Sequence, residues 1–223
     1  MPPRREHERR DISRRASRGR QRPPEPAAAS RDWRVAAVAA AGVLLAGYLA
    51  VAKFLGGSAA FCTAGGGCDT VQASRYAVML GVPTALWGVL AYATVGVLSV
   101  VGLTTTRWLV AFAIAAGAVG FSAYLTWLEL FVIRAVCGYC LVSAALAVGL
   151  LAALFWSRPA TTGRRSAVRP ARLVTLGAAA AVATIVVGAA IFAAGRESGS
   201  APYQEALARH LASTGAVMYG AYW

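Results

Sequence analysis

Four cysteines form two closely spaced pairs, and each pair borders a long apolar segment. Cys62 and Cys68 flank a Thr-Ala-Gly-Gly-Gly run, whereas Cys137 and Cys140 form a Cys-Gly-Tyr-Cys motif. Two dithiols at a membrane surface can pass electrons to one another by thiol–disulfide exchange. The second pair opens an apolar segment, where the unpaired N–H groups and dipole of a helix N-terminus stabilise a thiolate. These residues indicate redox chemistry on disulfides.

The same cysteines allow other interpretations. A purely structural disulfide between Cys62 and Cys68 is one, although a mobile glycine run gives such a clamp little advantage. A zinc site would need further ligands, and the two histidines of the chain lie one in each tail. Haem attachment would need a histidine after Cys140, where Leu141 stands. Inert, buried thiols remain an alternative for the C-x-x-C pair.

Five segments are long and apolar enough to cross a membrane, which takes about 20 residues. The chain is 58% hydrophobic yet carries a net charge of +13, because its arginines are concentrated outside these segments. The sequence therefore predicts an all-α membrane protein with five transmembrane helices. They are expected at about residues 33–55, 84–103, 108–133, 138–156 and 173–194.

Two basic blocks indicate how the chain is oriented. Eleven arginines fall within residues 1–34, and five more lie between Arg158 and Arg172. Because basic residues favour the cytoplasmic side, the N-terminus is predicted to be cytoplasmic. All four cysteines then lie outside, where disulfides persist. The basic tail has no aromatic residue before Trp33, so nucleic-acid binding is not expected.

The first outer loop is expected to contain a short interfacial helix. Asp69 followed by Gln72 matches a capping box, which predicts a helix from Thr70 to about Leu80, stopped by the glycine and proline that follow. This helix is too short to span the membrane. Cys68 would lie just before its N-terminus, a position that again favours a thiolate.

These features occur in a distinctive order. After the loop pair come Ser74, then the segment Gly-Val-Pro-Thr-Ala-Leu-Trp-Gly at residues 81–88, then the C-x-x-C pair. Over roughly residues 33–156 this order resembles the bacterial branch of the vitamin K epoxide reductase family. The resemblance implies a four-helix bundle in the bacterial cytoplasmic membrane, with a quinone (menaquinone or ubiquinone) beside the C-x-x-C pair. It also implies an exported thioredoxin-like or DsbA-like dithiol protein as partner. No metal is expected, because the further ligands are lacking.

The resemblance implies a role for each site residue. Cys62 would exchange with the dithiol partner, and Cys68 would attack the Cys137–Cys140 disulfide at Cys137. Cys140 would then be the thiolate that faces the quinone. Ser74 would be a polar group near the quinone oxygen, although helix packing in lipid explains a serine there equally well.

A second resemblance concerns the end of the chain. Many bacterial relatives continue after a fifth span into a thioredoxin-like domain. Here residues 203–211 predict a helix and residues 215–223 a strand, and in the fused relatives such a strand leads into Trp-Cys-x-x-Cys. We therefore expect a thioredoxin-like domain that is cut off at Trp223, so that the dithiol partner is either fused or separate. The predicted division is a disordered cytoplasmic tail (1–32), the four-helix domain (33–156), a basic cytoplasmic loop (157–172), the fifth helix (173–194) and the outer tail (195–223).

The predicted activity is oxidation of a dithiol partner and reduction of a bilayer quinone, which supports disulfide formation outside the cytosol. The alternative is a non-enzymatic membrane scaffold or carrier with structural disulfides. Reverse electron flow would require thiols that are reachable from the cytosol, and none is predicted there. Glu129 lies in the third apolar segment, where a charge is costly. Three roles stay open for it: a part of the site, snorkelling toward the outer surface, or pairing with Arg134.

Overall fold

The computed structural model describes residues 31–56, 60, 62, 66–158, 170–199 and 202–215. Within these residues five helices are long and apolar enough to cross a membrane. This confirms the predicted all-α membrane fold. The predicted disordered tail, most of the basic loop and the predicted final strand lie outside the described residues. The long helices are α2 (Trp33–Phe54), α4 (Thr84–Val101), α5 (Thr105–Leu128), α6 (Gly138–Trp156) and α7 (Pro170–Gly199).

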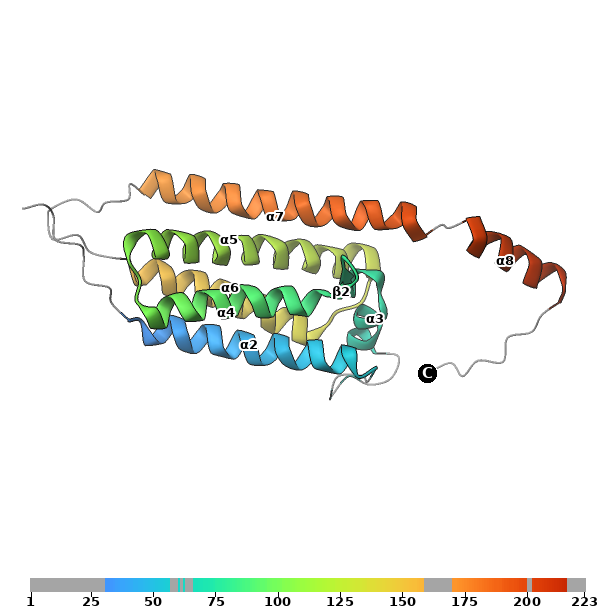
Figure 1. Ribbon diagram of the computed structural model, residues 1–223, viewed down its shortest axis with the longest axis horizontal. Helices are drawn as coiled ribbons and strands as arrows, with labels where there is room; N and C mark the ends of the chain where they lie inside the picture. The colour runs from blue at the N-terminus through green and yellow to red at the C-terminus, as the bar shows by residue number, and fades with distance from the viewer. Residues whose placement is uncertain are drawn as a thin grey trace, which may run out of the picture.

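Helices α2, α4, α5 and α6 form a closed four-helix bundle (Figure 1). The bundle closes because α2 packs on α4 and α6, while α5 packs on the same two helices. Buried Trp108 stacks on Phe112, and its indole N–H donates to the Leu154 carbonyl at 3.0 Å, which joins α5 to α6. The Tyr92 hydroxyl donates to the Ser143 carbonyl at 2.8 Å, which joins α4 to α6. The polar atoms of these two buried rings thus have partners, as lipid requires.

The short helix of the outer loop forms, but its predicted start is wrong. Helix α3 (Gly67–Ala73) is capped by Gly66 and not by Asp69. The Gly66 carbonyl accepts the N–H of Thr70 at 3.0 Å and its hydroxyl at 3.1 Å, so the first turn closes earlier than the capping-box pattern indicated. Asp69 lies inside that first turn, where its negative charge interacts favourably with the helix dipole. Cys68 is therefore part of the helix N-terminus instead of preceding it.

The predicted end of this helix is also wrong. After α3 the chain forms the 3-10 turn η1 (Arg75–Ala77) and a two-stranded antiparallel hairpin of β1 (Val78–Met79) and β2 (Val82–Pro83). Leu80 and Gly81, at the tip of the hairpin, have φ angles of 56° and 77°. Two-residue hairpin turns of this kind require positive φ at both positions, which a right-handed helix does not allow.

Helix α7 lies along α5, outside the four-helix bundle (Figure 1). At Gly120 a Cβ atom would come within 2.8 Å of Ala181, so only glycine permits this approach. The Thr184 hydroxyl donates to the Gly117 carbonyl at 3.0 Å. Small residues and such hydrogen bonds hold helices together in lipid. Helix α8 (Pro202–Ser213) follows and confirms the helix predicted for residues 203–211.

Candidate redox site

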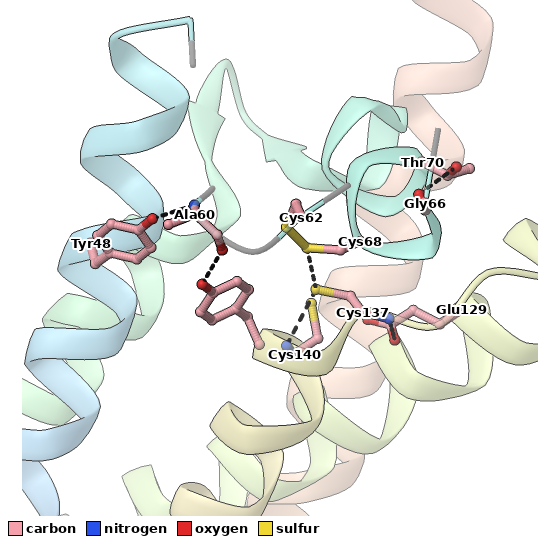
Figure 2. The surroundings of a disulfide bond; sticks show 10 residues. Tyr48, Ala60, Cys62, Gly66, Cys68, Thr70, Glu129, Cys137 and Cys140 are labelled. Carbon is pink, nitrogen blue, oxygen red and sulfur yellow. Dashed lines mark hydrogen bonds between the residues drawn. A yellow bond between two sulfur atoms is a disulfide. The ribbon is translucent and has the colours of Figure 1, made fainter. Parts of the chain in front are cut away.

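The two cysteine pairs meet at one end of the bundle (Figure 2). Cys62 and Cys68 form a disulfide, whereas Cys137 and Cys140 are free thiols. The sulfur atoms of Cys68 and Cys137 are 3.9 Å apart, although 69 residues separate them in the sequence. A disulfide and a dithiol in such contact can exchange when one thiolate attacks the other pair's sulfur. The structure thus brings all four predicted cysteines into one site.

Cys137 is held at the start of α6. Its backbone is extended, with φ of −101° and ψ of 113°, and its sulfur accepts the N–H of Cys140 at 3.4 Å as an N-cap. The Cys137 side chain is fully buried, and that of Cys140 is half-buried. The C-x-x-C spacing therefore places one sulfur against the outer loop and the other one turn into the helix.

The surroundings of Cys137 favour its thiolate. A hydrogen bond from the Cys140 thiol lowers the pKa of Cys137 to about 7. The backbone N–H groups of Cys140 and Tyr139 act in the same direction, while burial and the charge of Glu129 oppose them. The lowered pKa favours the Cys137 thiolate, the form that attacks a disulfide and leaves from one.

We expect Cys137 to titrate near pH 7 in protein whose two loop cysteines are replaced by serine. Its thiolate absorbance should appear as the pH rises through about 7, below the pH of about 8.5 at which an ordinary thiol ionises. Cys140→Ala removes the thiol donor and should raise the midpoint, whereas Cys140→Ser keeps a donor and should raise it less. An unchanged midpoint in Cys140→Ala would contradict the assigned cause.

Glu129 lies inside the site. Its side chain is only 2% exposed, and its carboxylate accepts the N–H of Cys137 at 3.2 Å. It opens the π-helical turn η2 (Glu129–Ile133), a feature that often marks functional sites. Arg134 ends this turn with φ of 57° and donates its N–H to the Glu129 carbonyl. Because the carboxylate is buried against the Cys137 backbone, Glu129 does not snorkel to the surface.

Two tyrosines hold the chain just before Cys62, and the sequence did not single them out. The Ala60 N–H donates to the Tyr48 hydroxyl at 2.5 Å, and the Tyr139 hydroxyl donates to the Ala60 carbonyl (Figure 2). These bonds tie the loop to α2 and α6. The one sequence signal was the position of Tyr139 inside the C-x-x-C motif, since Tyr48 lies in an ordinary apolar helix.

An apolar cavity of about 680 Å³ lies beside Cys140, between the helices. Such a volume with mostly apolar walls is typical of a small-molecule site. Ser74 also lines this cavity; its hydroxyl donates to the Val71 carbonyl at 2.7 Å, and its oxygen can still accept a hydrogen bond. The walls fit an apolar ring with few polar anchors. Among the described residues, no group of three or more His, Cys, Asp or Glu side chains is arranged to hold a metal ion.

Comparison with known proteins agrees with this arrangement. A profile of the vitamin K epoxide reductase family matches residues 33–155, which include the four-helix bundle and both cysteine pairs. The chain is also similar to the thiol-disulfide oxidoreductase LTO1 of Arabidopsis thaliana, with 32% identity over 189 residues. The match covers 75% of this chain and 50% of that protein, so the chain spans about half the length of this relative. The chain belongs to the vitamin K epoxide reductase family.

Proposed function

We propose that this protein is a membrane oxidoreductase that oxidises a dithiol protein and reduces a bilayer quinone. The observation that supports this proposal most strongly is the 3.9 Å contact between the sulfur atoms of Cys68 and Cys137, beside an apolar cavity that Cys140 lines. A scaffold with a structural loop disulfide has no need of a second, free dithiol against that disulfide. The name of the Arabidopsis relative, a thiol-disulfide oxidoreductase, supports the same activity.

Electrons would enter through the loop disulfide. A thiolate of the partner attacks Cys62, which breaks the Cys62–Cys68 bond and frees the Cys68 thiolate. Cys68 attacks the oxidised C-x-x-C pair at Cys137, and Cys140 leaves as a thiolate. The second thiol of the partner then releases Cys62, which attacks Cys68 and frees Cys137. The loop disulfide is restored and the C-x-x-C pair is reduced, which is the state of the structure.

The C-x-x-C pair would then be reoxidised at the cavity. Cys137 and Cys140 form a disulfide and release two electrons and two protons. A bound quinone supplies an acceptor for both, as it becomes a hydroquinone. The apolar walls would exclude water, and Ser74, which lines the cavity, would contact a ring oxygen. Menaquinone and ubiquinone share this ring chemistry, so either suits the proposal.

The basic blocks support a cytoplasmic N-terminus in a bacterial cytoplasmic membrane. Residues 1–30 precede α2, and residues 159–169 connect α6 to α7, so both blocks join the bundle at the end opposite the cysteines. By the positive-inside rule the cysteines face the exterior. The dithiol partner is then an exported thioredoxin-like or DsbA-like protein, either fused to the chain or separate from it. Together they support disulfide formation outside the cytosol.

The proposed function predicts a fixed stoichiometry. Protein reduced with dithiothreitol and freed of excess reductant is mixed with a quinone without oxygen. We expect one hydroquinone for each protein disulfide formed, with the Cys62–Cys68 and Cys137–Cys140 bonds counted together, because each bond releases two electrons. Ultraviolet absorbance follows the quinone, and peptide mapping identifies the disulfide. If neither a benzoquinone nor a naphthoquinone is reduced, the scaffold alternative is favoured instead.

A further inference from the structure

The cavity is much longer than a site for a quinone ring requires. Its lining extends from Glu129, the first residue of η2 beside the cysteines, along α5 to Ala113. These residues are sixteen positions apart, which corresponds to about 24 Å at about 1.5 Å per helical residue. The hydrocarbon core of a membrane is about 30 Å thick. A ring beside Cys140 would occupy only the outer end, and most of the cavity extends from there into the membrane.

Helix α7 forms one wall of this deeper part. Ala180, Ala183, Thr184 and Val187 line it, and α7 lies outside the residues that match the family. The Thr184 hydroxyl is within 3.0 Å of the carbonyls of Gly117, on α5, and of two residues on its own helix. Because the hydrogen of that hydroxyl is already used, Thr184 offers the cavity no donor, and the other three residues are apolar. The wall therefore suits a hydrocarbon chain.

The edge of this wall is open to the bilayer. Ala183 is exposed, and Val187 is 57% exposed. Both still line the same cavity as Cys140. The cavity therefore connects the redox-active thiols to a surface that lipid covers. A molecule with a reactive ring and a long apolar chain can occupy both parts at once.

We propose that α7 and the facing part of α5 bind the alkyl chain of the quinone, while its ring lies beside Cys140. This inference rests on the proposed function and extends it, because it assigns to the fifth helix a part in substrate binding. The α7 part and the part beside Cys140 belong to one cavity. A quinone can fill both parts, with its chain in the first and its ring in the second. A lipid acyl chain carries no ring for the part beside Cys140.

The test compares two quinones that differ only in the chain: decylubiquinone and the same ring without its decyl group. Binding to the oxidised protein is measured by quenching of tryptophan fluorescence, since Trp87 lines the cavity. Ala183→Phe fills the α7 part from its exposed side, where the larger side chain does not enter the protein core. We expect it to raise the Kd of decylubiquinone on the order of tenfold, with the Kd of the ring unchanged. Ala183→Leu should give a smaller effect of the same kind.

The matched control is Val182→Phe, because Val182 is 58% exposed and does not line the cavity. It should change neither Kd. The inference is overturned if the wild type binds both quinones equally well, as it would if a lipid chain held this space. It is also overturned if Ala183→Phe leaves decylubiquinone binding unchanged or weakens both quinones equally. A wild type that binds neither quinone contradicts the proposed function itself, which separates the two failures.

Discussion

Replacement of Cys137 or Cys140 by serine is expected to abolish quinone reduction by dithiothreitol, with a loss on the order of 10³-fold or more. In the proposed mechanism each thiol performs a step that the other cannot. Cys137, which contacts Cys68, would receive the electrons, and Cys140, which lines the cavity, would pass them to the quinone. Without either sulfur no disulfide can form at the cavity, so no electron pair is released there. The measurement is the rate of quinone absorbance loss, in the absence of oxygen, for each purified variant.

The loop cysteines provide the matched control. Cys62→Ser and Cys68→Ser should lose much less activity with dithiothreitol, because a small reductant can reach the half-buried Cys140 directly. With a protein dithiol as donor, the same two variants should be severely impaired, since a large partner needs the loop to carry its electrons. Near wild-type turnover in Cys137→Ser or Cys140→Ser would contradict the assigned roles.

Much of the fold was predictable because it depends on local sequence. Apolar runs of sufficient length determine the membrane helices, whatever their neighbours. The C-x-x-C pair was correctly placed at a helix start, since Cys137 follows the short turn at residues 134–136 and precedes an apolar run. The outer loop was harder to predict from the sequence. Asp69 and Gln72 match a capping box, but Gly66 begins the helix because its carbonyl takes both donors of Thr70.

The parts of the site that sequence did not reveal depend on distant contacts. The position of Glu129 in the site follows from its hydrogen bond with the Cys137 backbone, which the turn η2 makes possible. The hydrogen bond between Tyr48 and Ala60 depends on how α2 packs. Nothing in the apolar run around Tyr48 distinguishes this tyrosine in the sequence. Likewise α7 is a plain sequence of small apolar residues. Its place on the cavity wall is set by its contact with Gly120.

A stable mixed disulfide is expected to accumulate when both thiols that could resolve it, Cys62 and Cys140, are removed. In Cys62→Ser/Cys140→Ser only Cys68 and Cys137 remain, and their sulfur atoms are already 3.9 Å apart. Mild oxidation should join them into a stable disulfide, because no neighbouring thiolate is left to attack it. Two matched double variants leave other pairs, namely Cys62 with Cys137 and Cys68 with Cys140. We expect both to form disulfides at least about tenfold more slowly, since exchange requires direct contact of the sulfur atoms.

Transfer of electrons between the loop and the C-x-x-C pair through Cys68 and Cys137 is the central claim, and mapping of this disulfide tests it most directly. The three double variants are oxidised under identical conditions, digested without reduction and analysed by mass spectrometry over time. The account predicts that the Cys68–Cys137 peptide pair appears first and becomes nearly complete. Equal rates in all three variants, or faster joining of Cys62 to Cys137, would contradict it.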